Sequence, residues 1–146
     1  MTAMREETGQ LLPHGASMCL LDVVDAWDQT SISCHTSTHR DPQKPLRSRG
    51  RLTVSAGLEY AAQAMGVHVG LLDRNGGFRN QIGYIGSVRD VVFTANRLDD
   101  LPGDLLVDAT RIVEGDHSYM YRFTVSHGGL AIIEGRASIF VKAEPR

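Results

Sequence analysis

A carboxylate and an amide lie four residues apart inside the most apolar stretch of this chain. Glu59 and Gln63 belong to the segment RLTVSAGLEYAAQAMGVHVGLL at residues 51–72. Residues four apart lie on one side of an α-helix, so the two polar groups would face the same space. Burying a carboxyl group is costly unless it is paired or protonated. Burial also raises the pKa of a carboxyl group, so Glu59 is a candidate general acid.

The segment that carries Glu59 is predicted to be one long helix over residues 51–72. Its remaining surface is mostly Ala and Gly, so we expect protein to surround the helix on every side. Thr53 or Ser55 is expected to cap its start, and the DRNGG sequence at 73–77 is expected to end it. One apolar face recurs at helical spacing, formed by Leu58, Ala61, Met65, Val69 and Leu72.

Strand-like segments flank this helix. Two precede it and four follow it, at residues 18–27, 30–36, 82–96, 105–114, 118–126 and 130–142. An antiparallel sheet that wraps one central helix satisfies this order, so we predict an α+β hotdog fold. A two-layer α+β sandwich of another topology is the alternative. We expect residues 1–146 to form one domain, with residues 1–10 loosely ordered.

Composition and charge restrict the classes of function. A formal net charge of −2 gives no basic field, which disfavours nucleic acid as a partner. We find no apolar run of membrane-spanning length and no secretory signal, so a soluble, cytoplasmic protein is expected. Cys19 and Cys34 fit buried free thiols. No residue spacing resembles a metal site or a glycine-rich phosphate loop, so we expect neither metal nor cofactor.

Several motifs resemble one family of enzymes. LLPHGASMCLLDVVDAWD at 11–28 resembles the opening segment of bacterial 3-hydroxyacyl-acyl-carrier-protein dehydratases of the hotdog superfamily. LEYAAQAM at 58–65 resembles their helix signature, in which a Gln follows a Glu by four residues. THRDPQKPLRSRGRL at 38–52 and GYIGSVRDVVFTANRLDDLPGDL at 83–105 are similar to the dehydratase-like subfamily of aryl polyene biosynthesis clusters. The resemblance extends from about residue 11 to residue 141.

This resemblance implies a homodimer with two active sites at the subunit interface. Glu59 would act on the leaving hydroxyl in the site of the other subunit. Backbone amides near Ala56 and Gly57 would hold the thioester carbonyl, and Gln63 would line the substrate site. The alternative for Glu59 is a structural ion pair with Arg51 or Arg89. Gln63 has its own alternative, a hydrogen bond that ties the helix to a loop.

The base of these dehydratases is a histidine in the loop before the helix. At the spacing of the better-known members, its position falls on Lys44 or Pro45, and no HFPG-type segment is present. The nearest loop histidine is His39, and we assign the base to it. A neutral imidazole suits proton abstraction near pH 7. The alternative is an ordinary exposed loop histidine.

The loop at 40–51 is also rich in positive charge. Its one acidic residue is Asp41, against the five basic residues Arg40, Lys44, Arg47, Arg49 and Arg51. Such a patch would attract an acidic acyl carrier protein that presents its acyl-phosphopantetheine substrate. The alternative is a solvated loop without a partner.

We therefore predict dehydration of a 3-hydroxyacyl thioester to the trans-2-enoyl thioester, with His39 as base and Glu59 as acid. Two alternatives remain. In a hotdog thioesterase, the helix carboxylate would activate water against the acyl carbonyl. In a non-catalytic subunit, the chain would bind acyl carriers or a related hotdog chain without catalysis.

Overall fold

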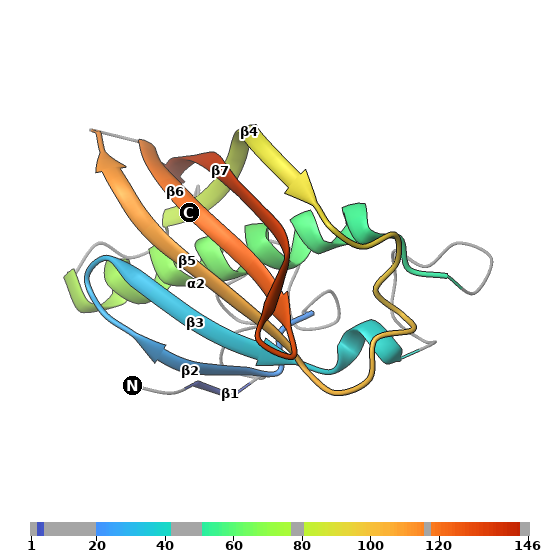
Figure 1. Cartoon of the computed structure of the whole chain (residues 1–146). Coiled ribbons are helices and arrows are strands. Elements are labelled where there is room, and N and C mark those ends of the chain that lie inside the picture. Colours follow the sequence, from blue (N-terminus) through green and yellow to red (C-terminus); the bar gives the residue numbers. More distant parts are fainter. Residues whose placement is uncertain (1–2, 5–19, 42–50, 77–80, 116–117, 144–146) are drawn as a thin grey trace.

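A computed structural model of the chain describes residues 3–4, 20–41, 51–76, 81–115 and 118–143. It contains one antiparallel sheet that curves around one long helix (Figure 1). The helix α2 spans Gly57–Gly76 and follows two short 3-10 turns, η2 at Thr38–Arg40 and η3 at Val54–Ala56. This arrangement confirms the predicted hotdog fold.

The sheet has seven strands in the order β1-β2-β3-β5-β6-β7-β4. They span Ala3–Met4 (β1), Val23–Trp27 (β2), Ser31–Thr36 (β3), Gln81–Phe93 (β4), Leu105–Glu114 (β5), Ser118–His127 (β6) and Leu130–Ala143 (β7). Every neighbouring pair is antiparallel. Among the described strands, β4 pairs only with β7, so it forms one edge of the sheet.

Most predicted strands match in position, and the main differences lie at element starts. Residues 20–22 precede β2, whose first residue is Val23 instead of the predicted residue 18; residues 18–19 lie outside the described part. The helix starts at Gly57 instead of Arg51, because residues 54–56 form the turn η3. The expected cap is absent because the hydroxyls of Thr53 and Ser55 bond each other at 2.9 Å.

Two local features explain how the chain forms this sheet: glycines in a tight turn, and the alternation of buried and exposed residues along a strand. Gly128 and Gly129 have φ values of 59° and 83°, as a tight hairpin turn between β6 and β7 requires. Along β6, Tyr121, Phe123 and Val125 are buried and alternate with more exposed residues, as in a strand with one face toward the core. Residues 1–10 were predicted to be loosely ordered. Residues 3–4 are the described part of this segment and form β1, and the rest lies outside the described residues.

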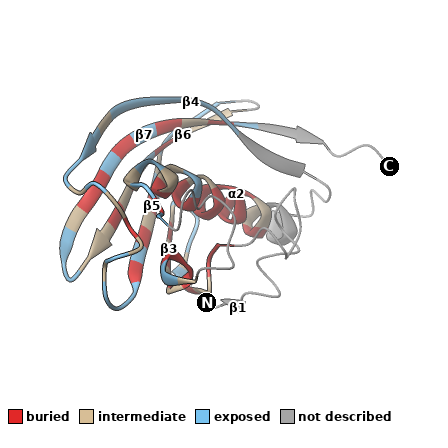
Figure 2. Ribbon diagram, turned by 90° about the vertical axis from the view of Figure 1, so that its right-hand side faces the viewer, coloured by how far each residue is buried: buried red, intermediate tan, exposed pale blue. Residues whose placement is uncertain are grey.

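The core lies between the sheet and the helix. Figure 2 shows α2 coloured as buried along most of its described length, whereas the described part of β4 is largely exposed. Tyr60, Ala61, Ala64 and Met65 of the helix are each at most 1% exposed. The helix is therefore enclosed by protein, as its composition predicted. Within the described residues, no helix is long and apolar enough to cross a membrane.

Candidate active site

His39 lies in the turn η2, directly after β3, and its side chain is buried. Its Nε2 lies 2.9 Å from the carbonyl oxygen of Leu101. A carbonyl only accepts, so Nε2 carries a proton, and the neutral imidazole has its lone pair on Nδ1. Burial lowers the pKa of His39 the most. The positive charge of nearby Arg40 lowers this pKa further, whereas the hydrogen bond to Leu101 raises it. His39 is thus neutral near pH 7, as a general base must be.

Buried hydrogen bonds hold the turn that carries His39. The hydroxyls of Thr36 and Thr38 each donate to the carbonyl oxygen of Leu20 at 2.5 Å. Between these two residues, the amide of Ser37 donates to the carboxylate of Asp22 at 2.7 Å. The turn is therefore fixed to the segment that enters β2, and His39 is not the exposed loop residue that the sequence also allowed.

The same turn contacts the start of the helix. The hydroxyl oxygens of Thr38 and Tyr60 lie 2.9 Å apart, and both side chains are buried. Thr38 precedes His39 and Tyr60 follows Glu59, so the structure brings together the two segments that carry the predicted base and acid. Sequence reasoning missed both hydroxyl residues, because their pairing depends on a tertiary contact.

Glu59 differs from the sequence prediction in its environment. It lies in the first turn of α2, yet its side chain is exposed in the single chain. The burial expected for an acid catalyst is therefore not provided by this chain alone. No ion pair among the described residues involves Glu59, so neither Arg51 nor Arg89 holds it.

The predictions for the substrate-binding residues Ala56, Gly57 and Gln63 have different outcomes. The amide of Ala56 donates to the carbonyl of Thr53 at 3.0 Å, and the amide of Gly57 donates within the same turn. Both donors are engaged in the 3-10 turn, so they would hold a thioester carbonyl only after this turn opens. Gln63 is buried, and its Oε1 accepts from the amide of Leu20 at 2.7 Å. This is the tie between helix and loop that the sequence allowed.

Only part of the predicted docking patch is described. Arg40 and Arg51 are both exposed. Lys44, Arg47 and Arg49 lie outside the described residues. Cys34 is buried, as predicted, whereas Cys19 is outside the described part. Among the described residues, no group of His, Cys, Asp and Glu side chains has the arrangement of a metal site.

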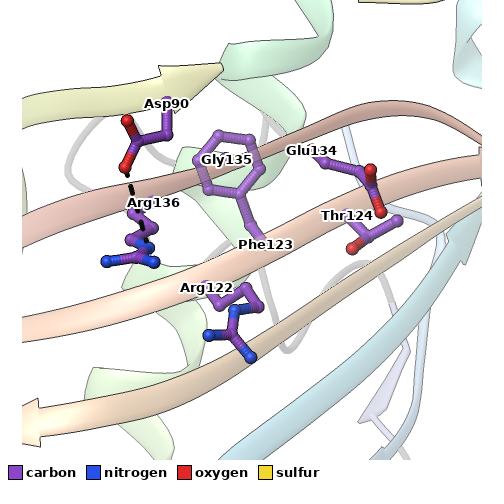
Figure 3. A pocket seen from close by; sticks show the side chains of 7 residues that line it. All are labelled: Asp90, Arg122, Phe123, Thr124, Glu134, Gly135 and Arg136. Carbon is purple, nitrogen blue, oxygen red and sulfur yellow. Dashed lines mark ion pairs between the residues drawn. The ribbon is translucent and has the colours of Figure 1, made fainter. Parts of the chain in front are cut away.

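A separate hollow of about 260 Å³ lies over β4, β6 and β7 (Figure 3). Its lining residues are Asp90, Arg122, Phe123, Thr124, Glu134, Gly135 and Arg136. Asp90 has a φ of 55° at a bulge in β4, and its carboxylate lies 3.8 Å from Nε of Arg136. None of the predicted site residues lines this hollow, so it is distinct from the candidate active site.

Solved structures share this fold. One, described as the dehydratase heterocomplex ApeI:P from Xenorhabdus doucetiae, gives a TM-score of 0.82 at 21% identity, over 95% of this chain and 91% of that chain. A thioesterase from Haemophilus influenzae gives 0.61 at 14% identity, over 100% and 95%. A mutant thioesterase from Staphylococcus aureus gives 0.60 at 13% identity, over 82% and 91%. At these identities the likeness shows the fold alone.

No curated protein matches the chain in sequence. The ApeP-like family, described as ApeP dehydratase, matches residues 6–146. That match contains both the buried His39 turn and the helix start with Glu59, and it agrees with the resemblance found in the sequence motifs. The chain therefore belongs to the ApeP-like family of dehydratases.

Proposed function

We propose that this chain dehydrates a 3-hydroxyacyl thioester, bound to an acyl carrier protein through phosphopantetheine, to the trans-2-enoyl thioester. The reaction would serve fatty acid or aryl polyene type biosynthesis. The observation that carries the proposal is the buried, neutral imidazole of His39, held beside the helix turn that bears Glu59. Membership of a dehydratase family supports the same reaction class.

The proposed elimination needs one base and one acid, which the resemblance places on different subunits: His39 of one chain and Glu59 of the partner subunit. Nδ1 of His39 takes the proton from Cα, and the electrons of that C–H bond form an enolate of the thioester. The electrons of the enolate then form the Cα–Cβ double bond. The bond from Cβ to the hydroxyl oxygen breaks, and the carboxyl group of Glu59 gives its proton to the departing hydroxyl, which leaves as water. Transfer of the proton from the imidazolium to the Glu59 carboxylate restores the starting state. No redox step and no cofactor is required.

A partner subunit would complete this site. Ile85 and Val88 of β4 oppose the buried residues Ile139 and Ala137 of β7, yet they remain 42% and 37% exposed. A free strand edge with exposed apolar side chains is a surface that another strand can cover. We propose that β4 pairs with β4 of a second hotdog subunit, which would also cover Glu59.

Two kinds of partner subunit fit this proposal: a second copy of this chain, or a different hotdog chain. The sequence predicted a homodimer. The similar structure from Xenorhabdus doucetiae is described as a heterocomplex, which favours a different hotdog chain as partner. Sedimentation of the chain alone, and after co-expression with a second hotdog chain, separates the two. A mass near 16.0 kDa under both conditions would contradict pairing.

Incubation with 3-hydroxyacyl-carrier proteins of several chain lengths tests the reaction. We expect intact-mass spectrometry to show the loss of one water from the carrier-bound acyl group. A thiol-reactive dye reports the alternative, because a thioesterase releases the free thiol of phosphopantetheine and a dehydratase does not. Absence of water loss with folded chain, alone and with a hotdog partner, would contradict the proposal and favour a non-catalytic subunit.

A further inference from the structure

The loop between β4 and β5 carries the sequence RLDDLPG at residues 97–103, and Asp99 is its most connected side chain. The Asp99 carboxylate is only 7% exposed. Its Oδ1 accepts from the backbone amide of Leu52 and from Nε of Arg97, each at 2.9 Å. Its Oδ2 accepts from Nη2 of the same guanidinium. The hydrogen bonds from Arg97 lower the pKa of Asp99 the most, and the bond from Leu52 lowers it further. Together they hold this pKa well below its usual range.

This carboxylate fixes the loop to the chain that leads into the helix. Leu52 is bonded on both sides, because its amide donates to Asp99 and its carbonyl accepts from the amide of Leu98 at 2.8 Å. The amide of Leu101 then donates to the carbonyl of Leu98 at 3.1 Å, which closes a turn over residues 98–101. The position of Leu101 is therefore determined by bonds that meet at Asp99 and Leu52.

The carbonyl of Leu101 is the group that accepts from Nε2 of His39. A carbonyl oxygen only accepts hydrogen bonds, so the ring nitrogen of a neutral histidine that faces a carbonyl carries the proton and the other nitrogen has the lone pair. A carbonyl in this place therefore holds the proton on Nε2 and the lone pair on Nδ1. If the turn moves, the imidazole loses the acceptor that fixes both its tautomer and its direction.

We propose that Asp99 is a positioning residue for His39, which acts through the Leu101 carbonyl to keep Nδ1 as the proton acceptor. The inference rests on the proposed function for its kinetic consequence but not for its structural one. Neither Asp99 nor Arg97 touches the reacting atoms in this account. The RLDDLPG motif, which the sequence resemblance singled out without a role, thereby gains one.

Two variants separate positioning from a purely structural role. Asp99→Asn keeps an oxygen that can accept from Leu52 but loses the charged, two-point contact with Arg97. Arg97→Lys keeps the charge but loses the planar fork. Asp100→Asn is the matched control, because Asp100 is an exposed neighbour whose carboxylate lies 3.8 Å from Nε of Arg97.

The test combines ¹⁵N spectra of the histidine rings with steady-state kinetics. In the unmodified chain we expect the His39 ring in the form protonated at Nε2. In Asp99→Asn we expect a mixture of both tautomers, a kcat about tenfold lower and a KM within about twofold, because a misplaced base slows the chemical step. Arg97→Lys should shift the ring in the same direction by less, and Asp100→Asn should change nothing.

Two results would overturn the proposal. One is a folded Asp99→Asn chain whose His39 tautomer equals that of the unmodified chain. The other is a loss of kcat in Asp99→Asn that is matched by Asp100→Asn. The ring spectra need no substrate, so a chain that shows the expected tautomers without dehydrating any thioester would contradict the proposed function and leave the positioning role standing.

Discussion

The hydroxyl oxygens of Thr38 and Tyr60 lie 2.9 Å apart in the core. This contact joins the turn that holds His39 to the helix turn that holds Glu59. Both hydroxyls are buried, so each needs a hydrogen-bond partner. The geometry of the candidate site therefore depends on a polar contact between two residues that have no role in the chemistry.

Tyr60→Phe tests that dependence. Removing the hydroxyl leaves the buried Thr38 with one partner fewer, which should lower the free energy of unfolding by about 1–2 kcal/mol. Turnover should also fall, because the base and the helix start lose a direct link. Tyr119→Phe is the control, since Tyr119 is only half-buried and its ring contact with Arg111 survives loss of the hydroxyl. Urea unfolding and initial rates measure the two effects; equal stability of both variants would argue against the link.

Glu59→Gln and His39→Ala are expected to act on different properties. Both should lower turnover by roughly 10²-fold or more, because each removes a proton-transfer group. Glu59→Gln should change the free energy of unfolding by less than about 0.5 kcal/mol, since the side chain is exposed. His39→Ala should destabilise the chain, because it empties a buried position that bonds Leu101. Glu114→Gln, at another exposed carboxylate, should leave turnover unchanged.

Stability should fall in acid because of two buried histidines. Burial is the main cause that lowers the pKa of both His39 and His68. In the unfolded chain both titrate near pH 6.5, so below this pH the unfolded state binds more protons than the folded state. Their contribution to stability is thus complete above about pH 6.5 and decreases as the pH falls.

The urea midpoint measures this effect, and it should be lower at pH 5.5 than at pH 7.5. His68 bonds the Tyr121 hydroxyl at 2.6 Å and the carbonyl of Asp28 at 2.8 Å. His68→Gln should therefore lower stability at both values while reducing its dependence on pH. A dependence as steep as that of the unmodified chain would mean that other groups cause it.

The exposed edge of β4 predicts an effect on assembly. Ile85→Lys places a charge at an apolar position that a partner strand would cover, so the proposed dimer should dissociate at a higher protein concentration than that of the unmodified chain. Leu130→Lys is the control, because Leu130 is 73% exposed and lies beside the β6–β7 turn instead of at the β4 edge. Sedimentation velocity measures both variants. Equal dissociation of the two would show that β4 is not the interface.

The sequence was sufficient for the order of the long helix and the strands that flank it. The alternation at Tyr121, Phe123 and Val125 and the mostly apolar helix each follow from local patterns that tertiary contacts reinforce. The helix start was predicted too early, because Thr53 and Ser55 resemble capping residues but bond each other instead. Local sequence does not reveal which of two possible partners a hydroxyl takes.

The environment of the site was less predictable. Gly57 and Ala56 were expected to offer free amides, but a 3-10 turn uses them, and only backbone geometry shows this. The exposure of Glu59 depends on how the rest of the chain packs around the helix start, which the local sequence does not show. The bond from His39 to Leu101 joins residues 62 positions apart, which no spacing rule reaches.

The most direct test of the proposed reaction is hydrogen exchange at Cα of a carrier-bound 3-hydroxyacyl group in deuterated water. Intact-mass spectrometry measures this exchange. In the proposed reaction, His39 removes the Cα proton and Glu59 protonates the leaving hydroxyl. We therefore expect Glu59→Gln still to incorporate deuterium into unreacted substrate while its loss of water is strongly reduced. His39→Ala should show neither exchange nor loss of water. Exchange that persists in a folded His39→Ala chain would contradict the assignment of His39 as the base.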